Sequence, residues 1–397
     1  MPTYRQVPVN WVDCRARHFR KERNLNELIS PKIAARTVQP RPERIFPTHP
    51  KPVRKKARFH LHDLGHWLRT RVQDRREARL GAAGRIHARY DGENALASRG
   101  ERIAIYSHYS STGRVSAMVQ SQLATYAAEG FEVIFVSMCA SLNGEDVARL
   151  QKICRAVVAR RSFGRDFGAW RDILSTDLVK RGQIQELLLV NDSVLGPIRP
   201  MEPLFDRMRM AEGLWGLINS DQNGSHLQSF FLLSRGQAAV EAAFAFFDHL
   251  NLSSDKEIVI SNGELSFSSS VARRAVPLWA LYGLCQVEDA ALGDRKTRLE
   301  TILSLGHAGI YAYVDGNPDA SDDDLNVRTR NVMAGSPVNP THQFGEVLVR
   351  RFDFPFIKTE LLVVNPSNMS IAATWRSLVT EESQCSVDMI VDHLCLL

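Results

Sequence analysis

Short apolar runs alternate with amphipathic stretches from residue 102 onward. Four of the runs have the length of a buried strand: 103–106, 131–137, 157–159 and 187–190. The stretches 115–128 and 145–154 carry apolar residues at the three-to-four-residue spacing of a helix. Because parallel strands need a crossover connection, usually helical, this order predicts a mixed, mainly parallel sheet flanked by helices. The expected fold class is therefore α/β, of the Rossmann-like kind.

The pattern continues less regularly through the second half of the chain. Further predicted elements are strands at 213–218 and 226–233 and helices at 170–179, 204–210 and 238–250. Another helix is expected to open at 262–266 and to run to residue 275, which places Glu264 in its first turn. The segment 315–324 is acidic and rich in turn residues, so we expect a surface loop there.

The first hundred residues have a different pattern. Closely spaced prolines at 40–52 disfavour both helix and strand, so 1–56 is expected to be largely irregular. From Phe59 to about Arg79 apolar residues return at helical spacing, with arginines on the other side. Such a helix could lie on anionic lipid, or it could pack on the body and expose its arginines. The sequence thus divides into three parts: a basic extension (1–100), an α/β domain (101–370) and a C-terminal tail helix (371–397).

Charge is divided unevenly along the chain. The whole sequence has 50 Lys and Arg against 44 Asp and Glu; residues 1–100 hold 23 against 9, which leaves 27 against 35 for the rest. We expect the basic part to meet a membrane surface rather than nucleic acid, because nucleic-acid-binding motifs and interleaved aromatic residues are absent. His60, His62 and His66 lie close together but lack a completing ligand, so no metal is expected there.

Cysteine usage and hydropathy bear on location. The six cysteines show no paired spacing, which is typical of reduced thiols in the cytoplasm. No apolar run reaches the ~18 residues that span a bilayer, and the N-terminus lacks the apolar core of a secretion signal. We expect a cytoplasmic protein held peripherally at the inner face of the cytoplasmic membrane.

Two polar clusters lie where predicted elements meet loops. The segment 191–193 (Asn-Asp-Ser) directly follows the apolar run 187–190, at the point where open α/β sheets bind ligands. Upstream, Arg165 and Asp166 stand between two glycines, just before a helical stretch. We expect the two clusters to form one site.

These side chains suit a phosphate and a metal ion. Asp166 and Asp192 offer the carboxylate oxygens that Mg²⁺ or Mn²⁺ prefers, and Arg165 could bind phosphate directly. Either positive charge, the metal ion or the arginine, would neutralise the phosphate groups of a sugar donor as its leaving group departs. A structural alternative stays open, since each aspartate could instead cap a turn or a helix. No G-x-G-x-x-G or G-x-x-x-x-G-K-[ST] motif follows the first strand, so dinucleotide and P-loop sites are not expected.

Transfer to a hydroxyl group also needs a general base within hydrogen-bond reach of that hydroxyl. Glu264 and His226 are the candidates. Glu264 could instead be an acid favoured by a helix N-terminus, and His226 a packed strand residue. Lys358 and Glu360 could contact substrate or form a structural ion pair.

Several separated segments together resemble one known family. They are 164–168 (GRDFG), 187–197 (LLLVNDSVLGP), 215–217 (WGL), 226–231 (HLQSFF), 263–266 (GELS), 339–342 (NPTH) and 354–362 (FPFIKTELL). Their order and spacing, from about Arg102 to Pro366, resemble the rhamnan synthesis protein F family. That family is associated with rhamnose-containing bacterial cell-surface polysaccharide, and its members look like glycosyltransferases of the GT-A type.

The resemblance implies a GT-A-like fold and transfer of a sugar, rhamnose from a dTDP-activated donor, onto a lipid-linked glycan. Segment 191–193 would take the place of the Asp-x-Asp metal motif, with one carboxylate instead of two. Donor, cation and acceptor would then meet these side chains: Ser107, His108, Tyr109, Arg165, Asp166, Asn191 and Lys358 for the nucleotide-sugar, Asp166 and Asp192 for Mg²⁺ or Mn²⁺, and Asp192, Glu264 and His226 for catalysis. The alternative is a non-catalytic glycan-binding or assembly subunit of a polysaccharide synthesis or export complex.

Overall fold

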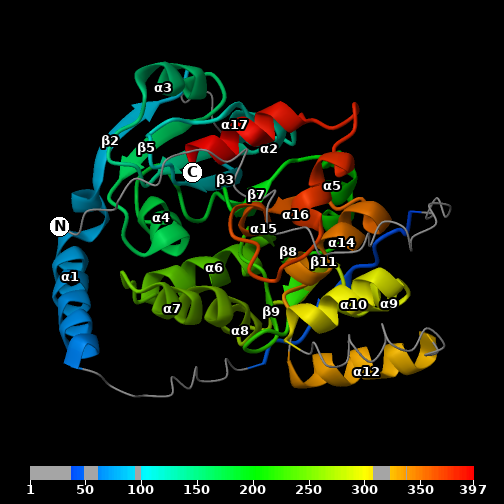
Figure 1. Cartoon of the computed structure of the whole chain (residues 1–397). Helices are drawn as coiled ribbons and strands as arrows, with labels where there is room; N and C mark the ends of the chain where they lie inside the picture. The colour runs from blue at the N-terminus through cyan, green and yellow to red at the C-terminus, as the bar shows by residue number, and fades with distance from the viewer. Residues whose placement is uncertain (1–36, 49–60, 94–99, 307–321, 337) are drawn as a thin grey trace. The chain divides into compact units, whose positions relative to one another are not determined.

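The computed structural model of the chain describes residues 37–48, 61–93, 100–306, 322–336 and 338–397 (Figure 1). The side chains of 61–69 and of residue 322 are not described. His60 and most of the arm expected to be irregular therefore lie outside the described residues, and of His62 and His66 only the backbone is described.

In the described part of the chain, one ten-stranded sheet carries the fold, in the order β1-β11-β8-β10-β6-β3-β4-β5-β2, with β9 paired to β8. Its strands are β1 (Glu43–Ile45), β2 (Ile86–Asp91), β3 (Arg102–His108), β4 (Glu132–Ser137), β5 (Ala156–Arg160), β6 (Glu186–Asn191), β8 (Gly213–Ser220), β9 (His226–Leu227), β10 (Phe231–Arg235) and β11 (Leu278–Tyr282). The block β6-β3-β4-β5 is parallel, as is the pair β8-β11, and β10 runs antiparallel between them. This mixed sheet confirms the predicted α/β fold.

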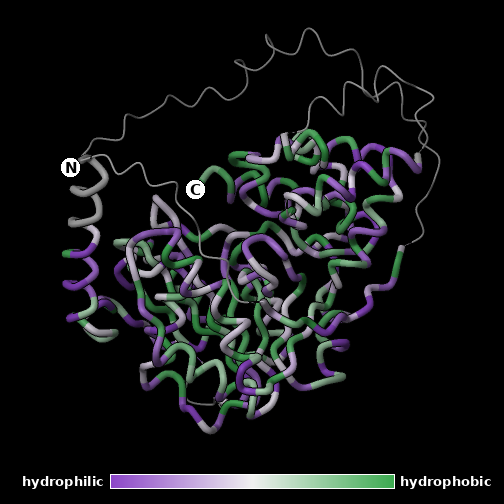
Figure 2. The backbone as a smooth tube through the Cα atoms, turned by 90° about the horizontal axis from the view of Figure 1, so that it is seen from below, coloured by the Kyte–Doolittle hydropathy of each residue, from purple (hydrophilic) through white to green (hydrophobic). Residues whose placement is uncertain are grey.

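Helices cover both faces of the sheet (Figure 1). One face carries α2 (Ala117–Ala128), α3 (Gly144–Gln151), α5 (Glu202–Met208), α9 (Leu284–Leu292) and α14 (Gly345–Phe352), which share a core with Tyr106 and Phe135. The other face carries α4 (Arg165–Leu174), α6 (Gln237–His249) and α8 (Ser266–Ala272), which pack around Ile105 and Ile134. Neighbouring residues of β3 and β4 thus enter opposite cores, as expected for strands buried on both sides. Figure 2 shows hydrophobic stretches through the middle of this unit, where the sheet lies.

The helix α2 shows how local sequence sets an element's ends. Ser116 is its N-cap, and the Ser116 side chain accepts a hydrogen bond from the Val119 N–H. Beyond its last turn stands Gly130, whose φ of 85° is a left-handed conformation that favours glycine. The predicted helix 115–128 and its closing glycine are therefore confirmed.

The C-terminal third of the chain returns to the carboxyl ends of the parallel strands. Its elements are α10 (Arg295–Ser304), α12 (Asp322–Gly335), α13 (Pro340–Gln343), β12 (Ile357–Lys358), α15 (Thr359–Val363), α16 (Ile371–Thr374), the 3₁₀ helix η4 (Trp375–Leu378) and α17 (Val387–Leu396). The short strand β12 pairs antiparallel with β7 (Val194–Leu195), which directly follows β6. This pairing brings residues 358–360 next to 191–193.

Three predicted boundaries in the body are wrong. Helix α4 begins at Arg165 rather than at residue 170, and the expected strand 226–233 is divided into β9 and β10. The helix expected to open near Glu264 begins earlier, as α7 (Lys256–Val259), and continues through the π-helical turn η3 (Ile260–Leu265) into α8. Glu264 therefore lies in a π-helical turn inside a longer helical run.

The two ends of the chain also differ from expectation. Residues 43–45, expected to be irregular, form β1 on β11, and residues 86–91 add β2 to β5 at the opposite edge. Helix α1 (Leu61–Arg85) confirms a helix before the body, with a kink at Gly81 (φ 65°). The tail after residue 371 consists of α16, η4 and α17 rather than one helix. Asp322–Asp324 begin α12 instead of ending a loop, and 315–321 lie outside the described residues.

Hydropathy of the described helices bears on membrane insertion. None of them combines the length and the apolar composition that crossing a bilayer requires.

Candidate functional site

The two predicted polar clusters meet at the carboxyl ends of β3 and β6. These strands are parallel neighbours, and Ser107 of β3 stands opposite Asn191 of β6 in their register. Both side chains are buried. The Asp192 N–H donates to the Ser107 carbonyl oxygen at 3.3 Å, so the chain leaves β6 against the end of β3.

Asp166 reaches this edge from the first turn of α4. Its Oδ1 accepts a hydrogen bond from the Ser107 hydroxyl at 2.7 Å, and its Oδ2 accepts one from Asn191 Nδ2 at 3.0 Å. The N-cap of α4 is Gly164, which offers no side-chain cap. Asp166 is therefore not the helix cap that the sequence left open, since its carboxylate is held between the two strand ends.

Asp192 is half-buried beside Asp166. Its Oδ2 accepts the Tyr109 N–H at 2.7 Å, so the predicted turn-capping bond exists for one of its two oxygens. Burial, and next the negative charge of Asp166, raise the pKa of Asp192 to about 7, against the Tyr109 hydrogen bond. Burial also raises the pKa of Asp166, although the Ser107 hydrogen bond and the charge of Lys358 oppose it. Because the carboxylates of Asp166 and Asp192 repel one another, a cation bound between them would be stabilised.

Lys358 supplies a positive charge to the same cluster. The β12–β7 pairing places its Nζ 2.9 Å from the Ser193 hydroxyl and 5.0 Å from the centroid of the Phe230 ring. Burial lowers the pKa of Lys358, and the carboxylates of Glu264, Asp166, Glu360 and Asp192 act in the opposite direction, in that order. Lys358 therefore lies within electrostatic reach of four carboxylates.

Glu264 joins the cluster from the turn η3. Its Oε1 accepts the Ser229 N–H at 3.0 Å, and its charge acts on both Asp166 and Lys358. The neighbouring Gly263 lets η3 approach α4, because a Cβ at this position would lie 2.7 Å from the Phe167 ring. The π-helical turn and this close approach together aim Glu264 at the site.

His226, the other predicted base, is a packed strand residue. It is buried in β9, and its Nδ1 lies 2.7 Å from the Gly224 carbonyl oxygen. Among the described residues, no hydrogen bond or ion pair joins His226 to the aspartates or to Lys358. Of the two candidates the geometry favours Glu264.

Three further predicted residues differ in how they face the site. His108 is buried inward, 3.1 Å from Ser137 Oγ, and burial, with His393 nearby, lowers the pKa of His108 to about 3, so its ring is neutral at physiological pH. Tyr109 contributes its backbone N–H, while its side chain is about half exposed. Arg165 is exposed beside Asp166 with a left-handed φ of 49°.

The donor set fits a divalent cation only in part. Within the described residues, no group of three or more His, Cys, Asp or Glu could hold a metal ion. Asp166 and Asp192 alone would suffice for Mg²⁺, which often binds one or two carboxylates and completes its shell with water and substrate phosphate. The positively charged side chain of Lys358 could neutralise a bound phosphate together with such a metal ion.

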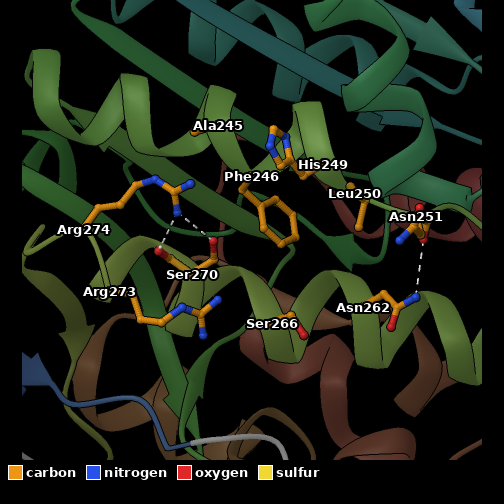
Figure 3. Close-up of a pocket in the computed structure, with 10 residues that line it drawn as sticks. All are labelled: Ala245, Phe246, His249, Leu250, Asn251, Asn262, Ser266, Ser270, Arg273 and Arg274. Carbon is orange, nitrogen blue, oxygen red and sulfur yellow. Dashed lines mark hydrogen bonds between the residues drawn. The ribbon is translucent and has the colours of Figure 1, made fainter.

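A cavity of about 440 Å³ lies elsewhere, between α6 and the η3–α8 run (Figure 3). Arg274 donates to the Ser270 carbonyl and hydroxyl oxygens at 3.1 Å there, and Asn262 to the Asn251 carbonyl (Figure 3). Its arginines directly follow the C-terminus of α8, where the helix dipole favours cations. None of the predicted site residues lines this cavity, so it is not the candidate site.

The fold and site define an α/β protein with a carboxylate–lysine cluster at the carboxyl ends of parallel strands. The profile of the rhamnan synthesis protein F family matches residues 133–276, which confirms the predicted resemblance over that part of the chain. The matched part includes Asp166, Asp192 and Glu264 and excludes Ser107 and Lys358.

The chain is also similar, at low identity, to curated proteins of two bacteria. Virulence protein VirA of Vibrio anguillarum is 28% identical over 223 residues, which are 55% of this chain and 66% of the relative. Protein y4gN of Sinorhizobium fredii is 27% identical over 252 residues, 60% of this chain and 65% of the relative. The chain thus spans just under two thirds of the length of these relatives. No solved structure matches it.

Sequence reasoning missed several side chains of the cluster. Ser193, Ser229 and Phe230 lay inside segments that it singled out, but no role was assigned to them. Among the described residues, no ion pair joins Lys358 to Glu360, although the charge of Glu360 acts on Lys358 and its Oε2 lies 3.6 Å from His342 Nε2. The sequence did single out the segments that contain His342 and Glu360, which are 339–342 and 354–362. Only contacts between distant parts of the chain show that these two segments meet.

Proposed function

We propose that this protein is a glycosyltransferase of bacterial cell-surface polysaccharide biosynthesis. It would transfer a sugar, rhamnose, from a nucleotide-sugar to a lipid-linked glycan on a GT-A-like fold. The observation that carries the proposal is the convergence of Asp166, Asp192 and Lys358 at the carboxyl ends of β3 and β6. Open α/β sheets bind their ligands at this edge, and opposite charges here suit a diphosphate with its cation.

Each side chain then has a stated task. Asp192, oriented by the Tyr109 N–H, would hold Mg²⁺ or Mn²⁺, and Asp166, fixed by Ser107 and Asn191, would support it. The cation would supply charge neutralisation for the departing diphosphate. Lys358, held by Ser193, would neutralise the same group from the other side. Glu264 would accept the proton of the acceptor hydroxyl.

The proposal is tested by release of nucleoside diphosphate from a panel of nucleotide-sugars, with Mn²⁺ and an oligosaccharide acceptor, across pH. Because the ionised form of Asp192 is needed, turnover should fall about tenfold per pH unit below about 7. Metal competes with protons for a carboxylate, so raising the Mn²⁺ concentration should move this midpoint to lower pH.

The contrary results of this assay are equally specific. Release that does not depend on pH between 5 and 8 would remove Asp192 from the mechanism. Saccharide binding without turnover of any nucleotide-sugar would favour the non-catalytic subunit, which the single carboxylate of segment 191–193 makes the second candidate.

Membrane association is proposed for the exposed side of α1. Asp74 and Glu77 anchor the helix, through hydrogen bonds to Ser253 and Ser254 and an ion pair with Arg161, while Arg75 and Arg76 face solvent. The helix thus packs on the body and shows arginines to water, and such arginines attract anionic lipid.

The double variant Arg75→Gln/Arg76→Gln should lower binding to phosphatidylglycerol vesicles by about 30-fold, at about 1 kcal/mol for each charge. Co-sedimentation measures this, with phosphatidylcholine vesicles as the lipid control. The pair Arg273→Gln/Arg274→Gln removes two exposed arginines elsewhere and should leave binding unchanged. Equal binding by both double variants would show that α1 has no special part in it.

A further inference from the structure

Gln228 carries a buried acceptor without a donor. Its Nε2 donates to Asn339 Oδ1 at 2.8 Å. That Oδ1 also accepts from the Thr341 N–H at 3.2 Å and the Thr341 hydroxyl at 2.8 Å, because Asn339 is the N-cap of α13. With three donors on Asn339 Oδ1, the amide of Gln228 has one possible orientation. Its Oε1 is then buried without a hydrogen-bond partner among the described residues.

His342 offers a second unpaired atom on the same support. It lies in α13, is 7% exposed, and its Nε2 is buried without a hydrogen-bond partner in the described structure. Glu360 Oε2 lies 3.6 Å from this atom, beyond hydrogen-bond distance. Burial lowers the pKa of His342 to about 4, so the ring is neutral at physiological pH. A neutral imidazole can donate to or accept from a ligand.

Both atoms border the carboxylate–lysine cluster. The residues after Gln228 contribute directly to it, since the Ser229 N–H donates to Glu264 and the Phe230 ring faces Lys358. On the other side, Glu360 joins His342 to Lys358 electrostatically. Helix α13 lies against both β8 and β12. The unpaired atoms therefore stand at the side of the cluster away from β3.

An unpaired buried polar atom destabilises a protein by about 1–3 kcal/mol, and a ligand that pairs with such an atom beside a site would remove that cost. Hydroxyl groups both donate and accept, and a saccharide presents several at fixed spacing. We propose that Gln228 Oε1 and His342 Nε2 form a subsite that binds the hydroxyl groups of a sugar next to Lys358. The sugar's identity rests on the proposed function, and it could belong to the nucleotide-sugar or to the acceptor glycan.

Calorimetry of the full chain tests the subsite with dTDP, dTDP-rhamnose and a rhamnose oligosaccharide as titrants. Gln228→Met and His342→Asn should each weaken binding of a sugar-bearing titrant about tenfold or more, and leave the affinity for dTDP unchanged. Loss confined to dTDP-rhamnose places the donor's sugar there, and loss confined to the oligosaccharide places the acceptor. Unchanged affinity for both sugar-bearing titrants in both variants would overturn the subsite.

The matched control is Gln343→Met. Gln343 is also buried with an unpaired Oε1, but its Nε2 donates to Ser304 and Ser367, away from the cluster. It should keep every affinity, and thermal melting of all three variants separates lost binding from lost folding. Oligosaccharide binding that depends on Gln228 and His342 in a protein without turnover would keep the subsite and refute the transferase. Turnover of a nucleotide-sugar, together with unchanged binding by both variants, would support the transferase and refute the subsite.

Discussion

Asp192→Asn is expected to lower sugar transfer by about 10² to 10³-fold while the protein stays folded. The amide keeps the shape of the side chain and can still accept the Tyr109 N–H, but it cannot carry the charge that a diphosphate-bound cation needs. Losses of this size are typical when one preorganised electrostatic group is removed. Because Asp192 and Asp166 repel one another, the substitution should leave the melting temperature unchanged or raise it. Nucleoside diphosphate release and thermal melting measure the two effects.

The control for this variant is Asp221→Asn, an exposed aspartate outside the cluster, which should keep full activity. Asp192→Ala removes the acceptor for the Tyr109 N–H as well, and should be inactive and slightly less stable than Asp192→Asn. Near-normal transfer by purified, folded Asp192→Asn would refute the role assigned to this carboxylate.

The part of the site that sequence could predict is the part set by strand ends. The apolar runs at β3 and β6 were clear, and parallel strands end at one edge of a sheet, so Ser107, Asn191 and Asp192 could be expected at the same edge; the structure shows that β3 and β6 are also neighbours. The start of α4 was not predictable in the same way. Gly164 (φ 72°) and Arg165 (φ 49°) both take left-handed conformations, which helical periodicity does not reveal.

The rest of the site depends on contacts between distant parts of the chain. Lys358 reaches Ser193 across 165 residues because β12 pairs with β7, two strands too short for a periodic pattern. Glu264 was singled out, but its orientation depends on a π-helical turn without a sequence signature. The family resemblance indicated these segments, and only tertiary pairing shows which side chains within them face one another.

Asp172→Ala is expected to destabilise the protein by about 3–5 kcal/mol, because it leaves two buried guanidinium groups without their carboxylate. Asp172 is 1% exposed, and Arg85 and Arg160 are 3% and 0% exposed. Arg85 Nε donates to Asp172 Oδ2 at 2.8 Å, and Arg160 Nε donates to the same oxygen at 3.0 Å. This contact fastens the end of α1 to α4, the helix that carries Asp166. The variant should therefore also weaken ligand binding at the site.

Urea unfolding measures the loss as a lower midpoint at an unchanged slope. The comparison is Asp177→Asn, which removes an ion pair between β2 and the segment after α4, with Arg89 Nη1 2.8 Å from Asp177 Oδ1. These two side chains are 38% and 78% exposed, so solvent screens the pair and its removal should cost less than about 1 kcal/mol. A similar small loss in Asp172→Ala would mean that the buried arginines find other partners. That result would show that the contact between Asp172 of α4 and the two arginines is not what holds α1 and β2 at the edge of the sheet.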